Sequence, residues 1–148
     1  MTLSTRRVFL RVCAMGTACG LASACGDNAS GAPAVFGDAA AGSVADIPVG
    51  TLRQVGTVPV FVGRDAGGLY ALTSTCTHAG CEVRTDGAGD TAVLFCPCHG
   101  SLFDRNGAVK RGPAPSPLVH FAVEVDAMGN VTIHGGTQVS AATRVAVA

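Results

Sequence analysis

Short apolar runs separated by glycine, proline and acidic residues dominate the chain from about residue 46 onward. Runs of about four to eight residues, rich in valine and other β-forming side chains, are typical of strands. We expect strands at 58–62, 69–73, 91–95, 118–125 and 131–134. Turn-forming sequences at 65–68 and 126–130 separate neighbouring runs and indicate hairpins. The pattern therefore predicts an all-β domain.

The segment 118–125 shows the clearest alternation of the chain. Apolar side chains at every second position from residue 119 alternate with His120, Ala122 and Glu124. This period of two predicts one buried face and one wetter face. We accordingly expect His120, and His134 on the following run, at the surface or at a sheet edge without a cofactor role.

The pattern differs before residue 46 and divides the chain. The sequence Thr5-Arg6-Arg7-Val8-Phe9-Leu10-Arg11 precedes an apolar stretch and matches a twin-arginine export signal. Residues 26–45, rich in small and polar side chains without a period, indicate a flexible linker. The predicted organisation is a signal at 1–25, a linker at 26–45, a β domain at 46–136 and a tail at 137–148.

The end of the signal has three interpretations. Small residues at 22–24 stand directly before Cys25, which suits cleavage or, imperfectly, lipidation at Cys25. If the apolar stretch were kept as an anchor, it would be about 20 Å long as a helix, short of the roughly 30 Å hydrocarbon core. Cleavage and lipidation are therefore favoured over an uncleaved anchor.

Composition limits the classes of function. The 148 residues carry ten Lys and Arg against ten Asp and Glu, so the net charge is zero and nothing favours nucleic acid. Six Phe, one Tyr and no Trp predict a thin, aliphatic core. Outside the histidines, the sequence offers no evident nucleophile or general base, so we expect no catalysis by the isolated chain.

Two cysteine-histidine clusters carry the candidate chemistry. The first is Cys76-Thr77-His78-Ala79-Gly80-Cys81 and the second is Cys96-Pro97-Cys98-His99-Gly100-Ser101. Two thiolates and two imidazoles suit a pair of irons, one bound by cysteines and the other by histidines. Structural zinc is the alternative, although zinc sites usually space their cysteines more widely than a Cys-x-Cys. Disulfides alone would leave both histidines unexplained.

The two clusters closely resemble those of Rieske 2Fe-2S proteins, in particular the high-potential type with a disulfide, and the resemblance covers about residues 46–134. It implies an antiparallel β-sandwich with two cluster-binding loops at one end. It further implies that Cys76 and Cys96 bind one iron, that His78 and His99 bind the other, and that a disulfide joins the remaining cysteines, Cys81 and Cys98.

The resemblance extends to residues around the clusters. Ser101 matches a position whose hydroxyl donates to a bridging sulfide, and Gly112-Pro113-Ala114-Pro115 resembles the loop that covers the cluster. Phe103 stands where members that oxidise quinol usually carry a tyrosine that donates to a cysteine sulfur. Ala79 stands where those members usually have leucine, which counts against quinol docking. We expect a potential in the lower or middle part of the Rieske range.

These features together predict an exported one-electron carrier, or the iron-sulfur subunit of a quinol-cytochrome c reductase-like complex. The alternatives are a small subunit of another exported oxidase, similar to arsenite oxidase, and a non-redox zinc module. Expected partners are cytochrome c, a cytochrome b-type complex or an oxidase large subunit, with quinol as a further candidate.

The export signal indicates the periplasm or the outer face of the cytoplasmic membrane, where a disulfide persists and a membrane surface is near. Because reduction adds negative charge, the affinity of the two ligand imidazoles for protons rises, so we expect electron uptake to couple to proton uptake.

Overall fold

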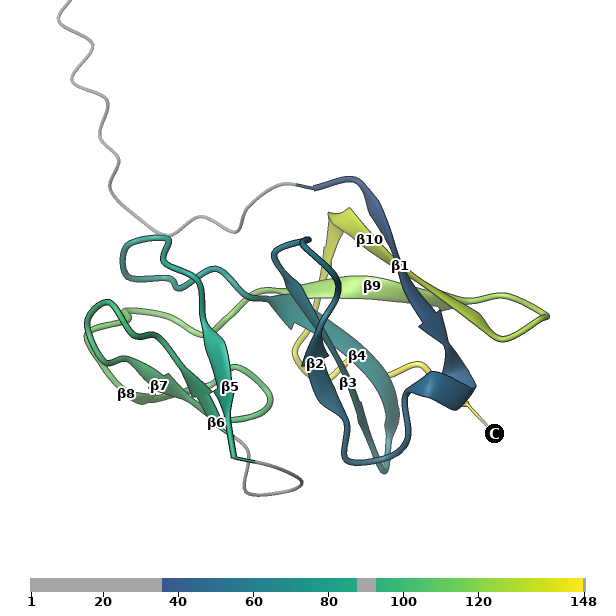
Figure 1. The fold of residues 1–148 in the computed structure, drawn as a ribbon, viewed down its shortest axis with the longest axis horizontal. Helices are drawn as coiled ribbons and strands as arrows, with labels where there is room; N and C mark the ends of the chain where they lie inside the picture. Colours follow the sequence, from purple (N-terminus) through teal and green to yellow (C-terminus); the bar gives the residue numbers. More distant parts are fainter. Residues whose placement is uncertain (1–35, 88–92, 148) are drawn as a thin grey trace, which may run out of the picture.

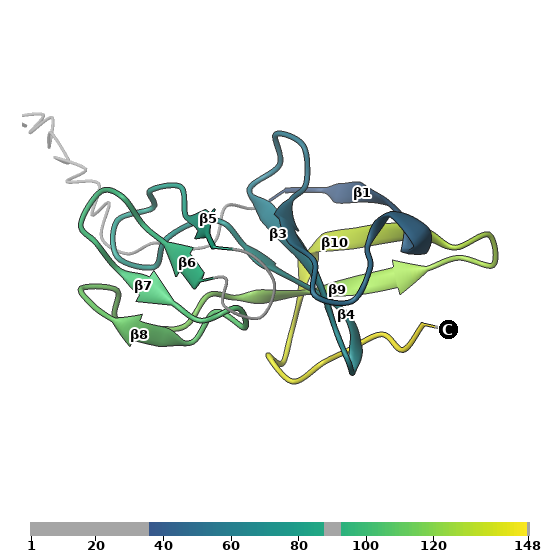
Figure 2. The same cartoon turned by 60° about the horizontal axis from the view of Figure 1, so that its bottom comes forward.

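The computed structural model describes residues 36–87 and 93–147, which form two antiparallel sheets (Figure 1). The larger sheet contains, in spatial order, β1 (Asp38–Ser43), β10 (Asn130–Val139), β9 (His120–Val125), β4 (Gly68–Thr73), β3 (Val60–Asp65) and β2 (Leu52–Gln54). The smaller sheet contains β5 (Arg84–Asp86), β6 (Val93–Phe95), β7 (Leu102–Phe103) and β8 (Val109–Arg111). Figure 2 shows the smaller sheet at one end of the molecule and the β9–β10 hairpin at the other. The all-β prediction is confirmed.

Both predicted hairpins form. β3 and β4 pair from Val60 opposite Thr73 to Asp65 opposite Gly68. Gly68 has φ +128°, and a Cβ there would lie 2.2 Å from the Val145 carbonyl oxygen, so only glycine fits this turn. In the β9–β10 turn, Asp126 accepts hydrogen bonds from backbone N–H groups further along the turn. Each predicted run overlaps a strand, but residues 58–59 and 118–119 precede β3 and β9, and residues 91 and 92 lie outside the described residues.

Two cores share the strands β3 and β4. Val62 and Ala71 face the first core, which is closed by aliphatic residues of β10. The alternate residues Phe61 and Leu72 face the second core. That second core also contains Cys76 and Cys96, Leu94 and Phe103 of the smaller sheet, and Val83 just before β5. The central strands are therefore buried on both faces, and one of these faces packs in the same core as the two free cysteines.

The predicted domain boundaries were wrong at both ends. Residues 38–43, assigned to the linker, form β1, and residues 44–46 form a short 3-10 helix, η1 (Val44–Asp46). The short side chains of Ala39 and Ala41 fit under the sheet edge, so a strand forms without a visible apolar period. At the other end β10 continues to Val139, and Val145 exchanges backbone hydrogen bonds of 2.9 Å with Leu69.

The prediction of a surface or edge position was also wrong for His120. Its side chain is buried, and its Nε2 lies 3.3 Å from the Asn106 Oδ1. The β7–β8 turn of the smaller sheet carries Asn106 and covers the face of β9 that the alternation assigned to solvent. Burial lowers the pKa of the His120 imidazole.

The predicted export signal, Cys25 and residues 26–35 of the predicted linker lie outside the described residues. Within 36–87 and 93–147, no helix has the length and apolar character to cross a membrane.

Candidate metal centre

The first cysteine-histidine cluster forms the loop between β4 and β5. The N–H of Cys76 donates to the carbonyl of Cys81 at 2.8 Å, and the N–H of Gly80 donates back to the carbonyl of Cys76 at 2.9 Å. Gly80 has φ +73°, a left-handed conformation that favours glycine. This closed turn fixes where Cys76 and His78 project.

The second cluster, between β6 and β7, repeats that backbone. The N–H of Cys96 donates to the Ser101 carbonyl at 2.9 Å, and the N–H of Gly100 donates to the Cys96 carbonyl at 3.0 Å. Gly100 has φ +76°. Because Arg84 pairs with Phe95 across β5 and β6, both loops lie at the same end of the smaller sheet. The sequence therefore builds two equivalent loops, with histidine at the third position of one and at the fourth of the other.

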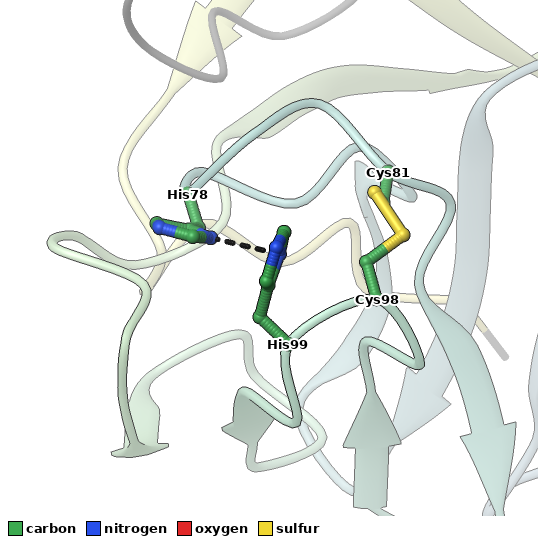
Figure 3. Close-up of a disulfide and its surroundings, with 4 residues drawn as sticks. All are labelled: His78, Cys81, Cys98 and His99. Carbon is green, nitrogen blue, oxygen red and sulfur yellow. Dashed lines mark hydrogen bonds between the residues drawn. A yellow bond between two sulfur atoms is a disulfide. The ribbon is translucent and has the colours of Figure 1, made fainter.

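A disulfide joins the loops. Cys81 and Cys98 are bonded with their Cα atoms 6.5 Å apart, within the usual range for a disulfide (Figure 3). The pairing that the resemblance implied is confirmed.

The two loop histidines point toward each other (Figure 3). The Nδ1 atoms of His78 and His99 lie 3.2 Å apart, and the ring planes are close to perpendicular. Metal–imidazole bonds of about 2.0–2.1 Å allow two nitrogens at this separation to bind one metal ion. His78 is half-buried and His99 is exposed, so the pair is accessible to a redox partner.

Cys76 and Cys96 are the free cysteines among the described residues, and both are buried. Burial raises the pKa of the Cys96 thiol, and the neighbouring Cys76 thiol raises it further. Backbone N–H groups of Cys98 and His99 act in the opposite direction by donating to this sulfur. A bound cation would stabilise both thiolates, because metal binding replaces the thiol protons.

The sulfur of Cys96 lies within 4.8 Å of the sulfurs of Cys81 and Cys98, which would otherwise suggest a three-cysteine metal site. The disulfide takes two of these sulfurs, so only Cys96 among the three can bind a metal. The donors that remain in the two loops are two thiols and two imidazoles.

The proline loop at 112–116 is attached to both ligand loops. The N–H of Ala114 donates to Ser101 Oγ at 3.0 Å, and Thr77 Oγ1 donates to the Ser116 carbonyl at 2.6 Å. Gly112 and Pro113 are joined by a cis peptide bond at the start of this loop. Because Ser101 Oγ accepts here, its hydroxyl proton is left to donate elsewhere.

Two contacts near the centre were not predicted from the sequence. Thr77 separates a cysteine from a histidine in the first cluster, and its hydroxyl anchors the proline loop. Arg111, which lies outside both clusters, donates to the Gly100 carbonyl at 3.1 and 3.3 Å. Both contacts depend on loops that meet only in the folded chain, so no local pattern could have revealed them.

The family model of the Rieske [2Fe-2S] domain matches residues 39–141. The chain belongs to the Rieske family. It is 35% identical over 94 residues to the cytochrome b6-f complex iron-sulfur subunit of Chlorobaculum tepidum, a match covering 62% of this chain and 51% of that protein. It is 44% identical over 62 residues to the ubiquinol-cytochrome c reductase iron-sulfur subunit of Rhodobacter capsulatus, covering 42% and 32%. The chain thus spans about a third to a half of these relatives.

Solved structures agree with this Rieske assignment. A chain in the complex of reduced oxygenase and oxidized ferredoxin in carbazole 1,9a-dioxygenase matches with a TM-score of 0.51 and 31% identity, over 70% of this chain and 97% of that one. The plasma membrane Rieske protein PetC3 from Synechocystis PCC 6803 matches with a TM-score of 0.50 and 32% identity, over 64% and 96%. The family's domain carries one 2Fe-2S cluster, and the two buried thiols and two facing imidazoles suit it. The family assignment thus favours iron and sulfide over zinc.

Proposed function

We propose that the protein carries single electrons on one 2Fe-2S cluster, with Cys76 and Cys96 on one iron and His78 and His99 on the other. The observation that supports this most strongly is the meeting of the two Nδ1 atoms, 3.2 Å apart, on loops that a disulfide joins. The two free thiols lie buried at the base of the same loops.

The charge of the ligand set favours ready reduction. Two ferric ions, two sulfides, two thiolates and two neutral imidazoles sum to zero, whereas four thiolates would leave two negative charges. When bound, the cluster supplies a one-electron couple at roughly −150 to +300 mV, against about −400 mV for all-cysteine plant-type ferredoxins. The exposed His99 edge gives an electron a short path to a partner, while burial keeps the thiolates from water.

Hydrogen-bond donors tune that couple. The backbone N–H groups of Cys98 and His99 donate to the Cys96 sulfur, and the Ser101 hydroxyl is buried with its proton free to donate. Phe103 lies in the second core with both free cysteines, where its ring brings no donor. Since donors to sulfur raise the potential, the lack of a donor at Phe103 supports a midpoint in the lower or middle part of the range.

For partners we favour other redox proteins over direct oxidation of a free quinol. The relatives are named as subunits of cytochrome b6-f and ubiquinol-cytochrome c reductase complexes, which supports a cytochrome partner. This chain, however, covers almost the whole of the small solved neighbours and presents the exposed Ala79 beside His78. The disulfide supports export to an oxidising compartment, and the motif at 5–11 favours the twin-arginine route for that export.

Removal of one histidine at a time tests the ligand assignment. His78→Ala and His99→Ala should each abolish the electron-paramagnetic signal of the reduced Rieske centre, because each leaves one iron with an incomplete ligand set. His134→Ala, which removes a histidine on β10, should keep the signal. Retention of the signal in both loop variants, or purification with zinc instead of iron and sulfide, would refute the proposal.

A stopped-flow experiment tests the choice of partner. The reduced protein should pass electrons to a c-type cytochrome, while the isolated oxidised protein should not be reduced by a short-chain quinol at a comparable rate. Rapid reduction by the quinol alone would overturn our preference and favour direct quinol oxidation.

A further inference from the structure

A hollow of about 330 Å³ lies between the β3–β4 hairpin, the β7–β8 turn and the C-terminal segment. The charged residues in its lining are Arg64, Arg105, Arg144 and Asp65, with Tyr70 also facing it. Three guanidinium groups therefore meet one carboxylate, an excess of two positive charges. No residue of either ligand loop lines the hollow, so it is separate from the metal centre.

Arg144 and Asp65 form one rigid side of the hollow. The Arg144 Nε donates to Asp65 Oδ2 at 2.7 Å, and its Nη2 donates to Asn106 Oδ1 at 2.8 Å. The guanidinium carbon lies 4.2 Å from the centre of the Tyr70 ring, a cation–π contact. Burial opposes ionisation of Asp65, but Arg144 and the Gly67 N–H hold its pKa below the ordinary value. The charge of Asp65 is thus matched by Arg144.

Arg105 is held in place by the backbone. Its Nη2 donates to the Gly50 carbonyl at 2.7 Å and to the Thr51 carbonyl at 3.2 Å. Its own carbonyl lies 3.4 Å from the Tyr70 hydroxyl. These contacts fix the position of the group before any ligand arrives, which reduces the entropy lost on binding.

Arg64 is held much more loosely. Its Nη1 lies 3.4 Å from the Ile47 carbonyl oxygen and its Nη2 3.5 Å from the Val147 carbonyl oxygen, both at the limit for a hydrogen bond. Across residues 36–87 and 93–147, no carboxylate forms an ion pair with it. A half-buried guanidinium whose hydrogen-bond partners are weak and neutral is suited to bind a charged ligand.

We propose that this hollow binds an oxyanion of the phosphate class, with Arg64 as its principal contact and Arg105 as a second. Guanidinium groups match phosphate oxygens in geometry as well as in charge. The volume lies at the small end of ligand sites, which fits an anion or a single head group better than a larger molecule.

Two sources supply this chemistry, a free phosphate compound and the head group of a phospholipid. The phospholipid head group is worth testing because the apolar side chain of Val49 at the rim of the hollow is 64% exposed. Arg64 also borders a neighbouring hollow next to Met128, which is 83% exposed.

Binding of inorganic phosphate to the cluster-loaded protein tests the site by calorimetry at constant ionic strength. The wild type should bind phosphate, and Arg64→Gln should weaken binding by about tenfold or more, since one charge-assisted contact is lost. Arg84→Gln is the matched control, because it removes an exposed arginine of β5 outside the hollow. Both variants should keep the spectrum of the metal centre.

Vesicles of phosphatidylglycerol and of phosphatidylcholine, each with and without Arg64→Gln, separate the two sources. Arg64-dependent flotation with phosphatidylglycerol supports the head group, whereas phosphate binding without flotation supports a free anion. Equal losses in Arg64→Gln and Arg84→Gln would show unspecific charge attraction and overturn the proposal, as would the absence of binding to both probes. Either result leaves the electron-transfer proposal intact, because the hollow contains none of the ligand residues.

Discussion

Strands of the larger sheet pair over as many as six residues, as β3 and β4 do from Val60 to Asp65, and the central ones bury apolar side chains on both faces. Strands of the smaller sheet are only two or three residues long, and β5 and most of β8 are exposed. Short strands of this kind give few ladder hydrogen bonds and little burial.

The smaller sheet is instead held together by contacts between its loops. The disulfide joins the two ligand loops, and the proline loop is attached to each of them through Ser101 and Thr77. Cys76 and Cys96 belong to its core, so their metal ligation would add further cross-links. One region is thus stabilised by regular packing, and the other by covalent, coordinate and loop contacts around the centre.

Loss of the cluster should show this difference most strongly. His99→Ala removes a proposed ligand, so the cluster should be lost, while the exposed side chain leaves no buried cavity. Hydrogen exchange measured by mass spectrometry should show large losses of protection in β5 to β8 and in both ligand loops, with little change in β3, β4 and β9. Equal losses of protection in both sheets would contradict the difference in how the two sheets are stabilised.

Removal of the disulfide should have the next largest effect. Cys81 and Cys98 are 17 positions apart, and closing a loop of that size stabilises by about 3 kcal/mol. In the double variant Cys81→Ser/Cys98→Ser, the free energy of opening the smaller sheet, measured by hydrogen exchange, should fall by about that amount. Reduction of the wild type should reproduce the change. A loss confined to the larger sheet would contradict it.

Substitution of either loop glycine should lower the stability of the protein by a similar amount. Gly80→Ala and Gly100→Ala each place a side chain on a left-handed residue, which costs about 1–2 kcal/mol, although neither new Cβ meets a clash. Each should lower the thermal midpoint of the cluster-loaded protein, by about 4–8 °C for each kcal/mol. Gly136→Ala is the control, since that glycine of β10 is neither left-handed nor crowded. A clear difference between the two loop variants would argue against equivalent loops.

Ser101→Ala tests whether the smaller sheet tunes the centre. If the Ser101 hydroxyl stabilises the reduced cluster by about 1 kcal/mol more than the oxidised one, its loss should lower the midpoint potential. That free energy corresponds to roughly 40 mV for a one-electron couple. Protein-film voltammetry measures it directly. Ser140→Ala, which changes an exposed hydroxyl after β10, should leave the potential unchanged. An unchanged potential in Ser101→Ala would exclude donation to the cluster.

The smallest effect is expected in the larger sheet, at His134. Its Nδ1 lies 2.9 Å from Asp38 Oδ1 on β1, and its Nε2 lies 3.0 Å from Glu124 Oε2 on β9. Asp38 and then Glu124 raise the pKa of His134 above 6.5, so this stabilisation is complete below about pH 6.5 and is lost as pH rises through the raised pKa.

Hydrogen exchange of β1 between pH 6 and 9, corrected for the intrinsic rate, measures the contribution of His134. Protection should fall with pH in the wild type and stay flat in His134→Gln, without any change in the ligand loops. Persistence of the pH dependence in the variant would assign it to other groups.

The sequence predicted the larger sheet better than the smaller one, and the reason is physical. β3 and β4 bury apolar runs and β9 alternates apolar with other residues, and both patterns are visible in the sequence. β5, β7 and β8 have no such period because their positions are set by loop contacts with residues far along the chain. β1 was missed for another reason, since alanines at Ala39 and Ala41 fill a shallow edge that needs no large side chain.

The cysteine-histidine motifs predicted two thiols and two imidazoles at the centre, and the assignment of each ligand came from the family resemblance. The disulfide pairing of Cys81 and Cys98 came from the family resemblance and is seen in the structure. The anchors Thr77 and Arg111 were not predictable, since each contacts a backbone carbonyl, which any residue offers. His120 was mispredicted because strand alternation reports which side a residue faces but not what later covers that side.

The pairing of β1 with β10 has a consequence for synthesis of the protein. Asp38 lies opposite His134, so the first strand acquires its only neighbour in the described sheet after nearly all of the domain has left the ribosome. Contacts of such long sequence separation form late and slow the folding of a chain. This edge of the sheet therefore closes only after β10 has been synthesised, and until then β1 lacks its partner strand.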